Sequence, residues 1–273
     1  MHVALIVERR YMEQAQPAGV AAELRRRTCE VSVVDPAATA VEVTRAGWFE
    51  GADICIARGR SQGVLSLLAS AEAAGAIAVN TSQSTAAVRD KARMAAVLAS
   101  AGLPTPTTYL GTAASLAAEI PAAAYPVVAK PVLGDNCRGV HLVDDVAQLL
   151  DYPFGSDEAL LAQPYVHGPG YDLKLYGIGD QVWAVRKRSP LSSNGARGGQ
   201  AAEPAALTPR LRELALACRR LFGVELYGVD CLETADGPIV IEVNEFPNYT
   251  AIPDADQRLA DYVIARTREV APQ

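Results

Sequence analysis

Three oxygen-bearing side chains near the end of the chain have the types and spacing of a metal site. Asp230 lies in an apolar segment, residues 228–232, and Glu242 and Asn244 lie in or directly after a second one, residues 239–243. Because side chains alternate along a strand, Glu242 and Asn244 share a face, and a hairpin would bring Asp230 beside them. Hard cations such as Mg²⁺ take oxygen ligands together with waters and substrate phosphates. We therefore expect a magnesium site for nucleotide chemistry rather than a zinc site.

The alternative is a solvated edge strand that carries scattered acids. Glu242 argues against it, because the residues around it are so apolar that a carboxylate without a neutralising partner would be costly there.

The composition is that of an ordinary globular protein of two or three compact units. The chain has 273 residues, half of them hydrophobic, and a formal net charge of −6, which argues against a surface that binds nucleic acid. No segment is long enough to span a membrane, and the first apolar run is too short for a signal sequence. The five cysteines are scattered and form no Cys-x-x-Cys pair. We expect a cytoplasmic protein without nucleic-acid or membrane partners.

Alternation of short apolar runs and helical segments predicts a small open α/β domain at the N-terminus. The expected strands are residues 3–7, 29–35, 52–58 and 76–80, and the expected helices are 18–27 and 64–74. Right-handed crossovers between such strands give a parallel sheet. The loop at residues 58–61, Arg-Gly-Arg-Ser, is either an anion site or a solvated turn.

The rest of the chain predicts two further units. A helix over 85–101 precedes strands at 127–131, 140–143 and 159–163, and period-two segments at 171–178 and 181–188 flank a Gly-Asp turn. A helix over 209–222 then precedes the carboxylate hairpin. We predict an N-terminal α/β domain at 1–84, a central lobe with a glycine loop at 85–166, and a C-terminal lobe with the metal-binding hairpin at 167–273.

Two further features suit phosphate groups. Lys130 ends an apolar run, where its ammonium needs an anion unless the side chain reaches back to water. Residues 134–139, Gly-Asp-Asn-Cys-Arg-Gly, can place backbone N–H groups around phosphate oxygens. This loop lacks the Gly-Lys-Ser/Thr of a P-loop and is a weak signal by itself.

Taken in order, these features resemble the ATP-grasp superfamily, and within it the RimK-type ligases, typified by the ribosomal-protein glutamate ligase and the lysine-biosynthesis ligase. The resemblance covers nearly the whole chain and lies in the order and spacing of the motifs. It implies an α/β protein with a two-lobed ATP-grasp core of α+β character behind the N-terminal domain. It also implies ATP and two Mg²⁺ (or Mn²⁺) ions, the latter held by Asp230, Glu242 and Asn244.

The resemblance assigns the nucleotide to residues along the whole core. Lys91, by itself an exposed helix lysine, and Lys130 would meet the phosphates, and Asp172 would hold the ribose. Pro164 departs from the family, where a glutamate is usual, and its ring nitrogen has no hydrogen to donate. The full nucleotide set is Lys91, Lys130, Gly134, Asn136, Gly139, Gln163, Pro164, Tyr165, Val166, Asp172 and Lys187.

For catalysis, the resemblance indicates Lys130 together with a substrate loop that carries Asn194 and Arg197. Arg186 or Arg188 would clamp a substrate carboxylate. The expected reaction joins a small-molecule carboxylate to an amine through an acylphosphate. It requires no nucleophile from the protein. Relatives often form homo-oligomers, so a homo-oligomer is expected here too.

Two alternatives stay open. Residues 244–249, Asn-Glu-Phe-Pro-Asn-Tyr, also resemble the end of inositol polyphosphate kinases of the same superfamily, which would fit a kinase that phosphorylates a small polyol or inositol phosphate. The few basic clusters of this acidic chain favour the ligase over such a kinase. The other alternative is a nucleotide-binding protein without catalysis.

Overall fold

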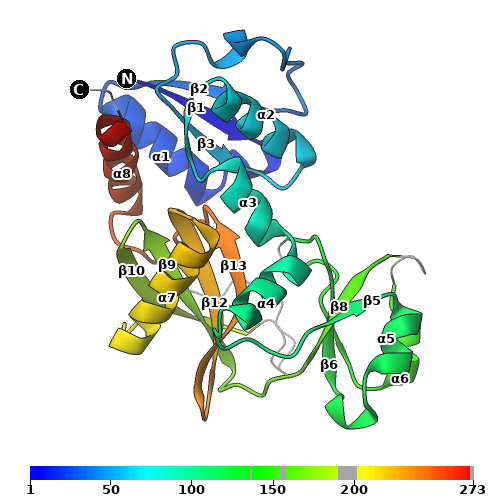
Figure 1. Ribbon diagram of the computed structural model, residues 1–273. Coiled ribbons are helices and arrows are strands. Elements are labelled where there is room, and N and C mark those ends of the chain that lie inside the picture. The colour runs from blue at the N-terminus through cyan, green and yellow to red at the C-terminus, as the bar shows by residue number, and fades with distance from the viewer. Residues whose placement is uncertain (136, 154–157, 190–201, 271–273) are drawn as a thin grey trace.

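The N-terminal unit is an open parallel sheet with helices on both faces. The computed structural model describes residues 1–135, 137–153, 158–189 and 202–270 (Figure 1). The sheet has the order β2-β1-β3-β4 and confirms the predicted parallel α/β domain. Its elements are β1 (His2–Val7), η1 (Arg9–Tyr11), α1 (Ala15–Arg26), β2 (Glu30–Val34), η2 (Ala46–Phe49), β3 (Ile54–Arg58), α2 (Gln62–Ala73) and β4 (Ile77–Val79).

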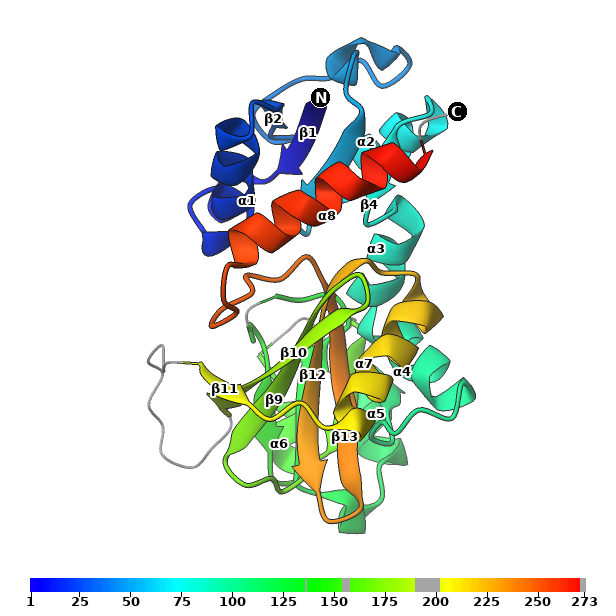
Figure 2. The same ribbon diagram turned by 90° about the vertical axis from the view of Figure 1, so that its left-hand side faces the viewer.

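Strand β1 is buried along its length because both faces of this sheet are covered. Val3, Leu5 and Val7 pack into the core shared with α1 and the C-terminal helix, α8 (Ala255–Val270). Ala4 and Ile6 pack on the other face, against α2. Helix α8 was not predicted from the sequence. It lies beside α1 (Figure 2), so the end of the chain returns to the N-terminal unit.

The central lobe is an antiparallel sheet of order β5-β8-β6-β7 with two short helices packed on it. The predicted strands at 127–131, 140–143 and 159–163 are present, whereas the first strand and helix of the lobe were missed. The elements are β5 (Tyr109–Gly111), α5 (Ala113–Glu119), η3 (Ala122–Ala124), β6 (Val127–Pro131), β7 (His141–Val143), α6 (Val146–Leu150) and β8 (Leu160–Pro164).

The C-terminal lobe is a five-stranded antiparallel sheet of order β11-β10-β9-β12-β13. Both predicted hairpins are confirmed, β9 with β10 and β12 with β13. One face of the sheet packs against α7, and α3 and α4 contact β13. The elements are β9 (Tyr171–Ile178), β10 (Gln181–Arg188), β11 (Glu203–Ala205), α7 (Pro209–Phe222), β12 (Leu226–Thr234) and β13 (Gly237–Glu245).

The prediction of a single helix over 85–101 is wrong, because the helical conformation is interrupted at Asp90. Helix α3 (Ser82–Arg89) ends there and α4 (Lys91–Ser100) begins. Asp90 has extended backbone angles, and its carboxylate accepts a hydrogen bond from the N–H of Arg93 at 2.9 Å, as an N-cap residue does. The break makes Lys91 the first residue of a new helix.

Helices able to cross a membrane are absent from the described ranges, since none there is both long and apolar enough.

We predict that Gly177→Ala destabilises the protein by at least about 2 kcal/mol. Gly177 of β9 pairs with Tyr227 of β12, whose ring is fully buried. A methyl group at position 177 would lie 2.0 Å from Cζ of that ring, so the sheet would have to shift. Gly47→Ala is the matched control, because nothing lies within 4 Å of its added methyl group. Chemical denaturation of both variants tests this, and equal stabilities would contradict it.

Candidate active site

The three predicted metal ligands come together on one face of the C-terminal sheet. Asp230 of β12 stands directly opposite Glu242 of β13, and Asn244 is the next residue of β13 on that face. All three line a cavity of about 900 Å³. The donors are two carboxylates and an amide oxygen, and such a hard-oxygen set fits Mg²⁺ or Mn²⁺.

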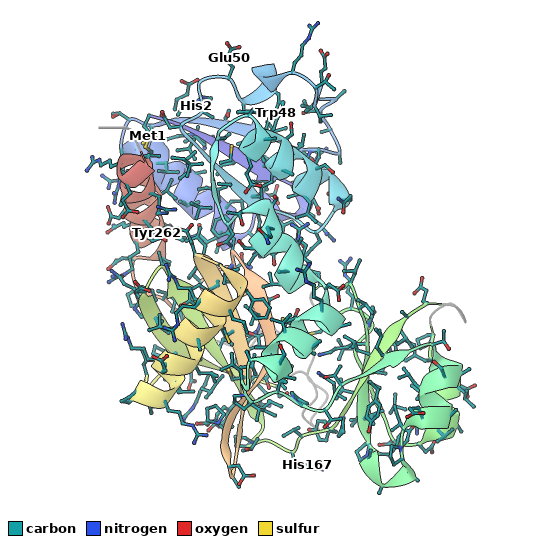
Figure 3. The ribbon with its side chains drawn as sticks, viewed as in Figure 1. Met1, His2, Trp48, Glu50, His167 and Tyr262 are labelled. Atoms are coloured by element: carbon teal, nitrogen blue, oxygen red, sulfur yellow. The ribbon has the colours of Figure 1, made fainter. Side chains whose placement is uncertain are left out.

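Among the described residues, no group of three or more histidine, cysteine, aspartate and glutamate side chains could hold a metal ion, and the predicted trio combines two carboxylates with an amide. His2 and His167 lie at opposite ends of the molecule (Figure 3).

Each of the three predicted ligands has a basic partner. The ammonium of Lys174 lies 2.7 Å from Oδ1 of Asp230, and that of Lys91 lies 3.2 Å from Oε1 of Glu242. The partner of Asn244 is Arg60, described below. Burial by itself would lower the pKa of Lys174, but the Asp230 carboxylate raises it above its ordinary value.

The two predicted phosphate lysines line the same cavity from different elements, Lys91 from the start of α4 and Lys130 from β6. Lys130 is the fourth residue of β6 and only 4% exposed. Burial lowers the pKa of Lys130, and Glu242 opposes this effect without cancelling it. Lys91 donates a hydrogen bond to the carbonyl of Gly134 at 3.0 Å. A phosphate would give the buried Lys130 ammonium an anion, and Lys91, which is already paired with Glu242, lies at the same cavity.

Asp172 is a buried acceptor with an unused oxygen. Asp172 lines the cavity, and its Oδ1 has no hydrogen-bond partner among the residues that the structure describes. Burial raises the pKa of Asp172, while a hydrogen bond from Ser189 opposes the rise. Buried polar atoms are rarely left without partners, so Oδ1 fits a ligand hydroxyl such as that of a ribose. Lys187, predicted for the nucleotide, is its cross-strand neighbour and also lines the cavity.

The segment predicted for adenine, residues 163–166, lines the cavity at the end of β8. The amide of Gln163 donates to Thr108 at 2.8 Å, and the N–H of Tyr165 donates to the carbonyl of Pro126 at 2.8 Å. These two groups are therefore engaged in holding the segment. The carbonyl of Pro164 and the N–H of Val166 remain the groups predicted to meet the purine.

The glycine loop reaches the cavity through Gly134 but not through Gly139. Gly139 has a φ of +72°, and its carbonyl accepts a hydrogen bond from the hydroxyl of Tyr152. Its place in the structure is thus at the base of the loop. Asn136, Asn194 and Arg197, also predicted from the sequence, lie outside the described residues.

Arg186 and Arg188 are not brought to the cavity. The guanidinium of Arg186 lies over the ring of Tyr171, 4.7 Å from its centroid. Lys187 takes the cavity side instead, as strand alternation requires.

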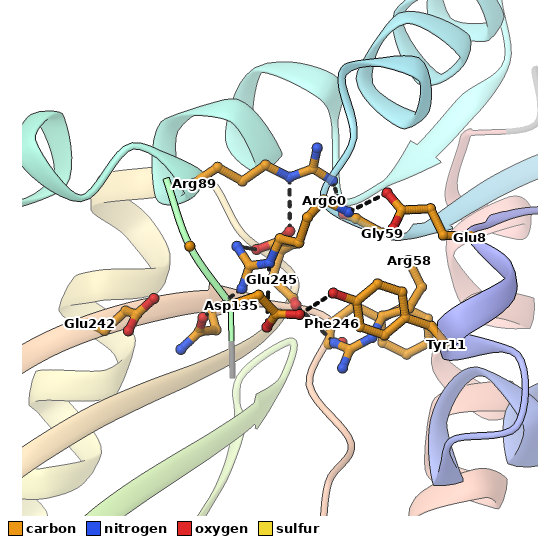
Figure 4. Close-up of polar contacts among 12 residues, drawn as sticks. Glu8, Tyr11, Arg58, Gly59, Arg60, Arg89, Asp135, Glu242, Glu245 and Phe246 are labelled. Carbon is orange, nitrogen blue, oxygen red and sulfur yellow. Dashed lines mark hydrogen bonds and ion pairs between the residues drawn. The ribbon is translucent and has the colours of Figure 1, made fainter. Parts of the chain in front are cut away.

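The structure adds Arg60 and Lys174 to the site. Lys174 follows Asp172 by two residues on β9, so strand alternation would have revealed it. Arg60 belongs to the loop that the sequence left undecided. Its guanidinium lies 2.9 Å from Oδ1 of Asn244 and 3.3 Å from Oε2 of Glu245 (Figure 4). The loop thus enters the cavity from the N-terminal unit and is not a solvated turn.

Comparison with known proteins identifies the family. The RimK-like ATP-grasp domain matches residues 88–265. The probable alpha-L-glutamate ligase 2 of Shewanella frigidimarina is 32% identical over 207 residues, which are 71% of this chain and 68% of that protein. The ribosomal protein bS6–L-glutamate ligase of Escherichia coli is 31% identical over 191 residues, 66% of this chain and 63% of that protein. The chain thus spans about two thirds of the length of these relatives.

Solved structures show the same fold over nearly the whole chain. A RimK-domain ATP-grasp protein of Sphaerobacter thermophilus has a TM-score of 0.76 at 22% identity, covering 97% of this chain and 100% of that one. The D-alanine–D-alanine ligase of Bacillus anthracis, solved with ATP, has a TM-score of 0.75 at 16% identity, covering 98% and 97%. The chain belongs to the RimK-like ATP-grasp family of ATP-dependent carboxylate–amine ligases.

We predict that Asp172→Asn stabilises the nucleotide-free protein at neutral pH and weakens ADP binding by about tenfold or more. The raised pKa means that the ionised carboxyl is less stable in the folded protein than in the unfolded chain. This penalty is present above the pKa of the folded state and disappears as the pH falls below that of the unfolded state, so the gain should vanish in acid.

Thermal unfolding at several pH values and calorimetric ADP titration measure these effects. Asp180→Asn is the control, since Asp180 lies in the exposed β9–β10 turn and pairs with Arg219. Unchanged ADP affinity in Asp172→Asn would contradict the ribose assignment.

Proposed function

We propose that the protein is an ATP- and Mg²⁺-dependent ligase that joins a carboxylate to an amine, forming an amide or peptide bond on an amino acid or small peptide. The observation that carries this proposal is the shared cavity. Two buried lysines, the unused oxygen of Asp172 and the oxygen trio on β12 and β13 all line it. The ligase names of the relatives agree with it.

In this proposal the nucleotide lies along the cavity from β8 to the C-terminal sheet. Residues 163–166 would hold adenine, Asp172 the ribose, and Lys91 and Lys130 the phosphates. Asp230, Glu242 and Asn244 would hold two Mg²⁺ or Mn²⁺ ions, which would supply charge neutralisation at the phosphates. A structure of the ATP-grasp ligase PsnB, solved with Mg and ADP, has a TM-score of 0.73 at 19% identity to this chain.

The proposed chemistry has two displacement steps. A substrate carboxylate oxygen attacks the γ-phosphorus, the bond to ADP breaks, and an acylphosphate forms. The amine nitrogen then attacks the acyl carbon, phosphate leaves, and the nitrogen loses a proton as the amide forms. The protein supplies position and charge rather than a nucleophile. Lys130 acts from β6, and Asn194 and Arg197 are the predicted residues of the substrate loop.

The relatives suggest which amine to test first. Both are named as L-glutamate ligases, so L-glutamate is our leading candidate for the amine, with a small-molecule or peptide carboxylate as the other substrate. A cytoplasmic location and a homo-oligomeric state stay predictions.

The kinase alternative is less well supported. The cavity lining in the described ranges carries seven lysines and arginines but also five aspartates and glutamates. Three of these basic groups, Lys174, Lys91 and Arg60, are already paired with the oxygen trio. A substrate with several phosphates would need cations that are free of such partners.

Product analysis separates the ligase from the kinase. We expect incubation with ATP, Mg²⁺, candidate acids and amino acids to release ADP and phosphate together with an amide identified by mass spectrometry. Formation of ADP with a phosphorylated acceptor and no free phosphate would identify a kinase instead.

We also expect ADP with Mg²⁺ to raise the unfolding temperature of the wild-type protein, and Glu242→Ala to lose most of the Mg²⁺-dependent part of this shift. The reason is that binding to the folded state alone stabilises it by mass action. Glu213→Ala is the matched control, because Glu213 is exposed on α7 and pairs with Arg220. A wild-type protein that gains no stability from ADP and Mg²⁺ would support the non-catalytic alternative or a protein that binds no nucleotide.

A further inference from the structure

The oxygen trio is occupied by the protein's own basic side chains. Lys174 contacts Asp230 at 2.7 Å, Lys91 contacts Glu242 at 3.2 Å, and Arg60 contacts Asn244 at 2.9 Å. These three cations come from β9, from the start of α4 and from the loop after β3. Each of the three side chains therefore has one oxygen paired with a cation of the protein.

Lys174 differs from the other two cations because Asp230 is its single partner. Within the described ranges its ammonium makes no other hydrogen bond or ion pair. Lys91 also bonds to the carbonyl of Gly134, and Arg60 also lies 3.3 Å from Glu245. If Lys91 leaves Glu242 or Arg60 leaves Asn244, each still has a second partner in the protein. Lys174 has no such second partner among the described residues.

A metal ion and the Lys174 ammonium would compete for the same carboxylate, that of Asp230. Magnesium binds carboxylate oxygens at about 2.0–2.1 Å. An ammonium that stays 2.7 Å from Oδ1 of Asp230 would then lie within a few ångströms of a divalent cation, where repulsion is strong. A metal ion on Asp230 would therefore disfavour the present position of the Lys174 ammonium and favour its movement to another anion.

We propose that Lys174 is a positioning residue that holds Asp230 while no metal is bound and makes metal binding depend on the nucleotide. The phosphates give Lys174 its alternative partner, so that Asp230 becomes available for the metal only when they are present. The inference rests on the proposed function, because it takes the nucleotide and the metal to share this cavity.

The test is a titration of the whole chain with Mn²⁺ in the absence of nucleotide. Electron paramagnetic resonance measures the concentration of the free ion. Lys174→Met should bind Mn²⁺ about tenfold or more tightly than the wild-type protein, because the competing charge is gone. Lys187→Met is the matched control. Lys187 lines the same cavity but stands opposite Asp172 rather than a predicted metal ligand. The Mn²⁺ affinity of the Lys187→Met variant should therefore differ from that of the wild-type protein by less than about threefold.

The same titration with saturating ADP measures the coupling. In the wild-type protein ADP should tighten Mn²⁺ binding strongly. In Lys174→Met the factor by which ADP tightens Mn²⁺ binding should be smaller than in the wild-type protein by about tenfold or more. By reciprocity, Mn²⁺ should tighten ADP binding by the same reduced factor.

The outcomes separate the two proposals. If the wild-type protein binds no Mn²⁺ even with ADP, the proposed function fails. If it binds Mn²⁺ with ADP but Lys174→Met binds nucleotide-free Mn²⁺ no more tightly, only the role of Lys174 is overturned. Circular dichroism checks folding. If the methionine variant does not fold, Lys174→Gln carries the same prediction, since it keeps a hydrogen-bond donor for Asp230 without the charge.

Discussion

The buried carboxylate of Glu245 is the junction on which the site depends. It ends β13 with 5% exposure, and a carboxylate so placed needs cations around it. Arg89 of α3 lies 3.0 Å away and Arg60 of the N-terminal unit lies 3.3 Å away. Arg89 also donates to the carbonyl of Gly59 (Figure 4) and to that of Ser61. One buried charge thus fixes the N-terminal loop, α3 and the C-terminal sheet relative to one another.

The consequence is that the N-terminal unit supplies part of the cavity. Glu8, at the end of β1, accepts the backbone N–H of Arg60 at 2.7 Å, which holds the loop from its other side. Gly59 has room for no side chain, because an added methyl group would lie 2.8 Å from both Glu8 and Val64. The loop therefore presents Arg60 to Asn244 in a fixed geometry. Its rigidity comes from hydrogen bonds to backbone groups, which the sequence of the loop does not display.

The features that could be predicted from the sequence are those that depend on local periodicity. Asp230, Glu242 and Asn244 converge because period two and one hairpin turn suffice to bring them together, and Lys174 follows from the same rule. Arg60 could not be assigned, since the burial of its loop depends on Arg89 and Glu245, which are distant in sequence. Helix α8 and the break at Asp90 were missed for related reasons. The first depends on packing against α1, and at the second an N-cap outweighs an alanine-rich helical pattern.

Packing between segments that are distant in sequence also explains the residues that resemble the end of a kinase, 246–249. Phe246 and Tyr249 are fully buried, and they pack into the core that joins the N-terminal unit to the C-terminal sheet. The hydroxyl of Tyr249 donates to the carbonyl of Gly177 at 2.8 Å, and the carbonyl of Phe246 accepts from Arg58. Of residues 246–249 as the structure describes them, Pro247 and Asn248 line the cavity and the two aromatic residues do not. The aromatic residues on which the likeness depends therefore serve the packing of two units, and a ligase needs that packing as much as a kinase does.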